Sequence, residues 1–234
     1  MDAAALRAHF PVFERLAYLN AGTCGPLPAE SARAASEVLE AAAGGGRWTP
    51  YFERTAQLQS HHRAAYAALL GAQPDDLALT TCTSEGIVRV LGALDLRPGD
   101  EVLTSDEEHP GLLGPLGAAR RRLGISVREV PFEEVAAAVG PRTRLLACSH
   151  VGWVSGKLAP DVRALDVPVL FDGAQGAGAV PVDVEALGCA FYAASGQKWL
   201  CGPVGTGMLW ISPAWQDRLA PPGPTYVNLA DPGA

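Results

Sequence analysis

The chain has 234 residues, of which 48% are hydrophobic and 18% charged, and its formal net charge is -7. A chain of this length can bury a sizeable core, and the composition is that of a globular protein, not of a disordered one. The acidic surplus supplies no basic face for nucleic acid, and no apolar run approaches the roughly 20 residues that cross a bilayer. We therefore expect neither nucleic acid nor a membrane as a partner.

The cysteines bear on the cellular compartment. Five are present, an odd number, and they are widely spaced without a CxxC pair. This pattern indicates neither a disulfide framework nor a zinc site, so no metal is expected. The N-terminal residues alternate charged with apolar side chains, unlike a signal peptide. A cytoplasmic protein with reduced thiols is predicted.

Two segments near the N-terminus have the apolar periodicity of helices, residues 29–43 and residues 52–70. Three consecutive glycines, residues 44–46, separate them and interrupt the pattern. The first part of the chain is therefore predicted to be helical.

Short apolar runs bounded by turn residues then alternate with longer stretches compatible with helices. The seven candidate strands are residues 77–81, 101–104, 126–130, 144–149, 167–171, 190–194 and 207–211. Residues 145–148 and 167–171 are apolar at successive positions, as in strands covered on both faces. The pattern predicts an α/β fold around a buried, mostly parallel sheet.

Polar residues follow five of the predicted strands. These clusters are residues 81–86 (TCTSEG), 107–110 (EEHP), 149–150 (SH), 172–175 (DGAQ) and 195–198 (SGQK). In open α/β sheets, ligands bind beyond the carboxyl ends of the strands, where such loops converge. We therefore expect one composite site at this edge of the sheet.

Each cluster contains side chains with a possible chemical role. Thr83 and Ser84 open a predicted helix, where hydroxyl and backbone N–H groups suit a phosphate, although an ordinary N-cap gives the same pattern. Asp172 ends an apolar strand and requires a cationic or hydrogen-bonding partner, such as a protonated ring nitrogen, a helix N-terminus or a salt bridge.

Lys198 and His109 are the candidate catalytic residues. Lys198 is followed by Trp199 and Leu200, which would desolvate its amine and favour the nucleophilic form, whereas a solvated lysine is the alternative. His109 is held by Pro110 at a strand end, where it can stack on a planar ligand or move a proton, unless it is an ordinary loop histidine.

Together these residues resemble the class V aminotransferase family of PLP-dependent fold type I enzymes, which includes cysteine desulfurases, selenocysteine lyases and isopenicillin N epimerases. The resemblance runs from residues 18–23 (YLNAGT) to residues 202–207 and is most specific at residues 171–175 (FDGAQ) and 195–199 (SGQKW). It implies a three-layer α/β/α sandwich with a mostly parallel, about seven-stranded mixed sheet. Residues 1–220 would form the PLP-binding large domain with its N-terminal helical segment. Residues 221–234 would lead towards a small C-terminal domain that this chain lacks.

The resemblance also implies roles for the site residues. Lys198 would hold pyridoxal 5'-phosphate (PLP) as a Schiff base and move the proton at the substrate Cα. Asp172, 26 positions earlier, would keep the pyridine nitrogen protonated. Gln175 would bind the phenolic oxygen, and His109 would stack on the ring. The phosphate ligands would be Thr83, Ser84, Ser195 and Gln197.

Two positions differ from the family pattern. Gln197 replaces a histidine that many desulfurases have, so it can donate a hydrogen bond but cannot carry charge. Trp153 replaces an asparagine near the cofactor, and we expect it to reshape the pocket. The family's substrate-binding arginine and the desulfurase cysteine belong to the C-terminal domain. None of Cys24, Cys82, Cys148, Cys189 and Cys201 is at the position of that cysteine.

The resemblance favours a PLP-dependent enzyme acting on a small amino acid, as a cysteine desulfurase, selenocysteine lyase or related C–S lyase, and as a homodimer. A Cα epimerase or an aminotransferase of the same family is the first alternative, and a truncated PLP-binding protein without activity is the second. A dinucleotide-binding oxidoreductase is disfavoured, because residues 173–178 read GxxGxG instead of GxGxxG.

Overall fold

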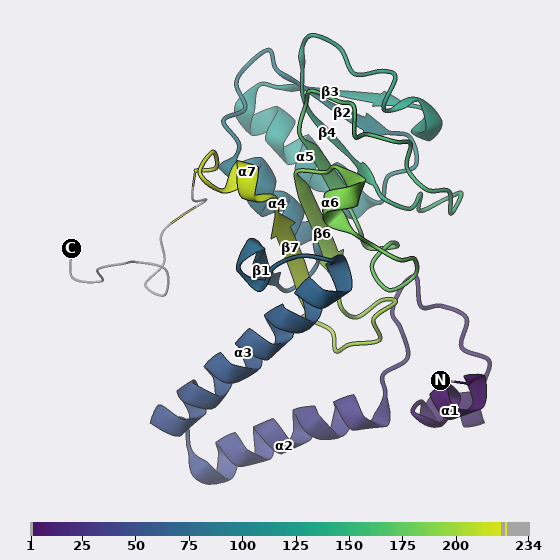
Figure 1. Ribbon diagram of the computed structural model, residues 1–234, viewed down its shortest axis with the longest axis vertical. Helices are drawn as coiled ribbons and strands as arrows, with labels where there is room; N and C mark the ends of the chain where they lie inside the picture. The colour runs from purple at the N-terminus through teal and green to yellow at the C-terminus, as the bar shows by residue number, and fades with distance from the viewer. Residues whose placement is uncertain (1, 221–222, 224–234) are drawn as a thin grey trace.

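A seven-stranded sheet forms the centre of the computed structural model, which describes residues 2–220 and 223 (Figure 1). The strands are β1 (Leu77–Thr80), β2 (Glu101–Ser105), β3 (Ser126–Val130), β4 (Thr143–Ser149), β5 (Val169–Asp172), β6 (Phe191–Ser195) and β7 (Gly207–Ile211). Their order is β1-β7-β6-β5-β4-β2-β3, and β7 is antiparallel to both of its neighbours while the other pairs are parallel. The predicted α/β class and mostly parallel sheet are confirmed.

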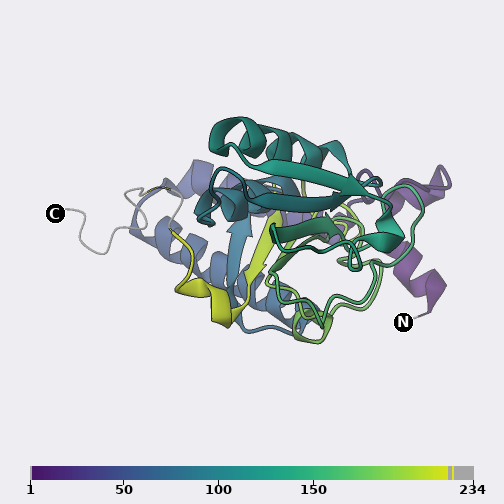
Figure 2. The same cartoon turned by 90° about the horizontal axis from the view of Figure 1, so that it is seen from above.

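Helices cover both faces of this sheet. The α-helices are α1 (Ala3–Ala8), α2 (Ala29–Gly45), α3 (Thr49–Leu70), α4 (Thr83–Ala93), α5 (Pro110–Leu123), α6 (Val184–Leu187) and α7 (Pro213–Gln216), and the 3-10 helices are η1 (Pro11–Glu14), η2 (Pro74–Asp76) and η3 (Phe132–Glu134). Helices α4 and α5 pack on one face, and the C-terminal end of α3 and α6 pack on the other. Figure 2 shows α5, the teal helix, lying along its face of the sheet.

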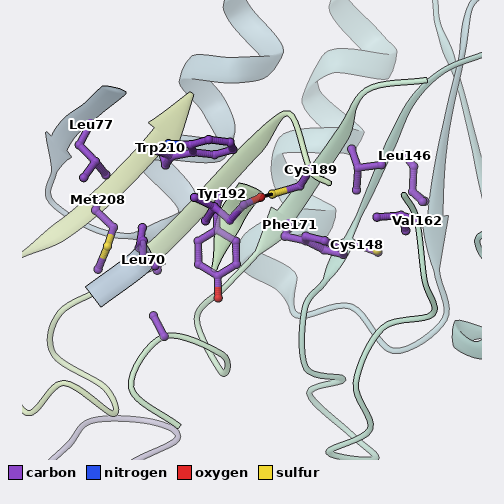
Figure 3. Packing of buried hydrophobic residues seen from close by; sticks show 14 of the residues in the cluster. Leu70, Leu77, Leu146, Cys148, Val162, Phe171, Cys189, Tyr192, Met208 and Trp210 are labelled. Atoms are coloured by element: carbon purple, nitrogen blue, oxygen red, sulfur yellow. Dashed lines mark hydrogen bonds between the residues drawn. The ribbon is translucent and has the colours of Figure 1, made fainter. Parts of the chain in front are cut away.

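The two hydrophobic clusters explain why consecutive strand residues are apolar. On β4, Leu145 belongs to the cluster under α4 and α5, whereas Leu146 belongs to the opposite cluster. Figure 3 shows the opposite cluster, in which Phe171 and Tyr192 lie side by side on neighbouring strands. Because side chains alternate between the faces of a strand, a sheet covered on both sides needs apolar residues at successive positions.

Helix α4 approaches the sheet closely at Gly86. A Cβ atom at this position would lie 2.9 Å from the Cβ of Ala193 on β6. Real side chains do not pack at this distance, so any larger residue would push α4 away from the strand. The glycine therefore sets the position of the helix N-terminus, where Thr83 and Ser84 lie.

Two boundaries differ from the sequence prediction in informative ways. Strand β5 begins at Val169 instead of residue 167, because Pro168 has no N–H to donate to the ladder. The strand also includes Asp172, which pairs with Ser149 and Ala193. The backbone of Asp172 is therefore fixed by strand pairing within the sheet, and its position does not depend on the loop that follows. The predicted exit segment, residues 221–234, lies outside the described residues apart from Gly223.

Helices α2 and α3 extend away from the sheet in Figure 1. None of the residues of α2 is buried, and only Tyr66, Ala67 and Leu70 of α3 are. Helix α2 continues through two of the three glycines and ends at Gly45, and its C-cap Gly46 has a φ of 76°, which suits a residue without a Cβ. In the described part of the chain, no helix is both long and apolar enough to traverse a bilayer.

A buried pair supports the turn that follows β5. The Nδ1 atom of His150 lies 3.0 Å from the Tyr192 hydroxyl. Burial lowers the pKa of His150 to about 4 and raises the pKa of Tyr192 well above its ordinary value, so a neutral imidazole is paired with a protonated phenol. The Tyr192 hydroxyl would lie 2.6 Å from a Cβ at Gly173 or Gly176. Both positions of the turn therefore require glycine.

This burial predicts a pH-dependent stability. Unfolded His150 binds a proton below about pH 6.5, whereas the folded form does so only below about 4. Its contribution is complete above the unfolded pKa and is lost as pH falls through this window, up to about 3 kcal/mol. Urea unfolding should show the free-energy difference between the parent chain and His150→Gln decreasing by this amount between pH 7 and 4. The exposed His61→Gln control should follow the parent at each pH, and parallel curves for His150→Gln would contradict the assignment.

Candidate active site

The predicted phosphate-binding residues meet where α4 begins. The backbone N–H of Thr83 donates to the Ser195 Oγ at 3.0 Å, and the two hydroxyl oxygens are 2.6 Å apart. Glu85 is turned back to accept hydrogen bonds from the N–H and hydroxyl of Thr81, both at 2.7 Å. The first N–H groups of a helix lack partners within it, and its dipole favours an anion there. This end of α4 can therefore receive a phosphate.

The N-terminus of α5 lies against that of α4. The Ser84 Oγ is 2.7 Å from where a Cβ of Gly111 would be. His109 caps α5, and its Nδ1 accepts a hydrogen bond from the Gly111 N–H at 2.9 Å. In the neutral imidazole the proton is therefore on Nε2.

Trp153, the residue predicted to reshape the pocket, packs against His109. The two ring centroids are 4.9 Å apart and the rings are nearly perpendicular, at 85°. This edge-to-face geometry is favourable between aromatic rings. The Trp153 side chain is 49% exposed, so it holds the imidazole on one side and presents an apolar surface to solvent on the other.

Asp172 is buried at the end of the central strand β5. Its Oδ1 accepts a hydrogen bond from the Ala174 N–H at 2.9 Å. Burial raises the pKa of the carboxyl, whereas the Ala174 hydrogen bond and the charges of Lys198 and His109 lower it. Three of the predicted site residues are thus close enough to influence one another electrostatically.

Lys198 is partly buried and lies within electrostatic range of Asp172. Burial lowers the pKa of its amine, and the charge of Asp172 opposes this effect. Its loop closes on itself, because the N–H of Gly202 donates to the Gly196 carbonyl at 2.8 Å. A lowered pKa increases the share of neutral amine that can attack a carbonyl.

The N-terminal segment, residues 18–25, packs against the Lys198 loop. The N–H of Gly25 donates to the Gln197 carbonyl at 2.7 Å. A Cβ at Gly25 would lie only 2.1 Å from the Lys198 carbonyl oxygen, so this position tolerates no side chain. The Tyr18 hydroxyl donates to the Cys24 carbonyl at 2.6 Å and closes the segment.

Gln175 connects this segment to the Lys198 loop. Its Nε2 donates to the Gly22 carbonyl at 3.0 Å, and its Oε1 accepts from the Trp199 indole N–H at 2.8 Å. Nearby in sequence, the Oε1 of Gln197 is buried without a hydrogen-bond partner among the described residues. A buried amide of this kind requires a polar partner, which a ligand can supply.

Sequence reasoning did not identify a role for Glu108, which joins the ends of β2 and β4. Its carboxylate accepts hydrogen bonds from the Ser105 hydroxyl at 2.5 Å and from the N–H and hydroxyl of Ser149 at 2.9 and 2.6 Å. Burial raises its pKa, and the Ser105 and Ser149 hydrogen bonds oppose this. Because Glu108 directly precedes His109, these bonds fix the backbone that carries the imidazole.

The candidate site does not coincide with the cavity at the opposite end of the sheet. A cavity of about 590 Å³ lies at the amino ends of β5 and β6, lined in part by Val169, Ala190 and Trp215, and contains none of the predicted site residues. Among residues 2–220 and 223, no group of three His, Cys, Asp or Glu side chains is arranged to hold a metal ion. The convergence of the strand ends identifies the candidate site.

Comparison with known proteins identifies the family. Residues 18–227 match the model of the class V aminotransferases, and the chain belongs to this family. It is 34% identical to a probable cysteine desulfurase from Methanothermobacter thermautotrophicus over 97% of this chain, and 33% identical to an isopenicillin N epimerase from Streptomyces clavuligerus over 91%. The chain spans 62% and 56% of the lengths of these curated relatives.

Solved structures agree with this assignment. A mutant of C-DES with glycine covalently linked to its PLP cofactor superposes with a TM-score of 0.87 and 31% identity, over 94% of this chain and 62% of that one. A complex of C-DES, a cystine C–S lyase, with its product cysteine persulfide gives a TM-score of 0.85 and 32% identity, over 93% and 62%. The predicted family and fold type I architecture are therefore confirmed.

Proposed function

We propose that this chain binds PLP through Lys198 and forms part of an enzyme that cleaves a C–S bond in a small, cysteine-like amino acid. The observation that carries the proposal is the proximity of a buried carboxylate, Asp172, to an amine of lowered pKa, Lys198, and to His109. A cystine C–S lyase and probable cysteine desulfurases among the similar proteins support this reaction class.

The side chains fit the chemistry that this cofactor requires. When bound, PLP supplies an electron-withdrawing ring that stabilises negative charge at the substrate Cα. Lys198 would hold the cofactor through its amine and, once a substrate amine has taken its place, would accept the proton at the substrate Cα. The Asp172 carboxylate would hold the ring nitrogen in its protonated form, and that cation would compensate the burial of the carboxylate. His109 would stack on the ring face and exclude water from it.

The phosphate group fits the N-terminus of α4. The hydroxyls of Thr83, Ser84 and Ser195 and the helix N–H groups are its donors, and the Thr83–Ser195 contact already aligns two of them. Gln197 adds a fourth side-chain donor once its amide turns its NH₂ group outward, because its Oε1 has no partner among the described residues.

A Cα epimerase is the second candidate, and one observation favours it. Isopenicillin N epimerases are as similar to the chain as the desulfurases are, at 33–34% identity. Epimerisation, transamination and C–S cleavage all begin with removal of the Cα proton, the task that the proposal gives to Lys198. They differ in what happens afterwards.

The homodimer and the compartment are also proposals. Apolar side chains are exposed on the α2–α3 hairpin, where Leu39 is 68% and Trp48 and Phe52 are each 63% exposed, and a second copy would cover them. All five cysteines are free, which suits a reducing compartment such as the cytoplasm.

The two lysines of this chain, Lys157 and Lys198, make the attachment test simple. Incubation with PLP followed by borohydride and peptide mass spectrometry should place the pyridoxyl group on Lys198. Lys198→Ala should lose the adduct and its visible absorbance, whereas Lys157→Ala, which removes an exposed amine paired with Glu133, should keep both. Equal labelling of both lysines, or no labelling, would refute the attachment.

A substrate panel separates the reaction classes. With PLP bound, C–S cleavage predicts release of sulfide or persulfide from cysteine, selenocysteine or cystine. Exchange of the Cα proton in D₂O without sulfur release would identify an epimerase, and a keto acid product an aminotransferase. PLP binding without any of these would identify a binding-only protein.

Sedimentation analysis tests the dimer. The chain should sediment with twice its monomer mass, and Leu39→Glu combined with Phe52→Glu should shift it to the monomer, because charges are costly in an apolar interface. The control Val88→Glu alters an exposed apolar residue on α4 and should not change the mass. A monomer at every concentration would contradict this proposal.

A further inference from the structure

The indole N–H of Trp199 makes a hydrogen bond within the protein although it is exposed enough to bond to water. Its side chain is 40% exposed, yet its N–H donates to the Gln175 Oε1 at 2.8 Å. A partly exposed indole N–H can bond to water instead, so this hydrogen bond is not needed to satisfy the tryptophan. Its effect is on the amide of Gln175.

A glutamine amide can present either its oxygen or its NH₂ group in a given direction. In this structure both ends of the Gln175 amide are assigned by their partners. The Gly22 carbonyl can only accept, so it requires the Nε2 end, and the Trp199 indole can only donate, so it requires the Oε1 end. The second N–H of Nε2 has no partner recorded in the described part of the chain and is available to a ligand.

Without the Trp199 hydrogen bond, the Gly22 contact alone constrains the orientation of the Gln175 amide more weakly. The segment that carries Gly22 is held independently by the Gly25–Gln197 and Tyr18–Cys24 hydrogen bonds. If the indole donor is removed, a 180° rotation of the amide loses only one hydrogen bond, and it turns an acceptor towards the position of the donor. The indole therefore biases the amide towards the donating orientation.

We propose that Trp199 is a positioning residue that fixes the amide orientation of Gln175, so that its free N–H donates to the ring hydroxyl oxygen of bound PLP. This inference rests on the proposed function, because it assumes that PLP occupies the site. Trp199 directly follows the attachment lysine. It would act on the ring hydroxyl oxygen through Gln175, without contacting the cofactor itself.

The pKa of the Lys198–PLP adduct nitrogen reports this donor directly. A hydrogen bond to the ring oxygen stabilises its negative charge and so weakens its hold on the proton shared with the adduct nitrogen. Trp199→Phe keeps an aromatic side chain and removes only the N–H. Absorbance titration should show the adduct pKa rising by about one unit, the size expected for loss of one hydrogen bond of ordinary strength.

A double-mutant cycle distinguishes positioning from general loosening. Gln175→Leu should raise the adduct pKa by a similar amount, and adding Trp199→Phe to it should cause no further shift, because both changes remove the same donor. Trp215→Phe, on α7 beside the cavity at the amino ends of β5 and β6, is the matched control and should leave the adduct pKa unchanged. Thermal unfolding of each apoprotein checks that the variants fold.

The outcomes separate the two proposals. If the parent chain forms no adduct, both the proposed function and this inference are overturned. If the adduct forms but its pKa in Trp199→Phe equals that of the parent, or if the shifts of the two variants add in the double mutant, only the role of Trp199 is overturned. An unchanged Gln175→Leu titration would overturn it as well.

Discussion

The burial of the Asp172 carboxylate at the end of β5 is the constraint on which the rest of the site depends. Burial raises its pKa, so the ionised form is maintained only by cationic or donating neighbours, which in this structure are the Ala174 N–H, Lys198 and His109. Each of these neighbours is held in position by contacts with other parts of the structure. The glycine turn over Tyr192 holds the backbone after Asp172, Glu108 holds that before His109, and the N-terminal segment holds the Lys198 loop.

The electrostatic balance of the site also indicates what kind of occupant suits it. A lysine and a carboxylate that are both partly desolvated form a pair whose net stabilising effect is small, because desolvation offsets much of their attraction. A cationic ring nitrogen beside Asp172 and a covalent bond at Lys198 would relieve both costs together.

Much of this arrangement could be predicted from sequence, and the failures have physical reasons. The positions of the strands and of the polar residues at their ends could be predicted, because a sheet covered on both faces leaves short, continuous apolar runs that end abruptly. The start of β5 was misplaced because Pro168 is apolar but cannot donate a ladder hydrogen bond. The roles of Glu108 and Trp199 were not accessible, because they depend on which strands are neighbours and on where the N-terminal segment lies.

The N-terminal segment has a consequence for how the protein is made. The hydrogen bond between Gln175 and Gly22 joins residues 153 positions apart, and that between Thr83 and Ser195 joins residues 112 positions apart. Contacts of such separation form late, because loop closure must precede them. During synthesis on the ribosome, the first 25 residues therefore lack their packing partner until the Lys198 loop has emerged. PLP attachment at Lys198 would likewise require synthesis to have passed this loop.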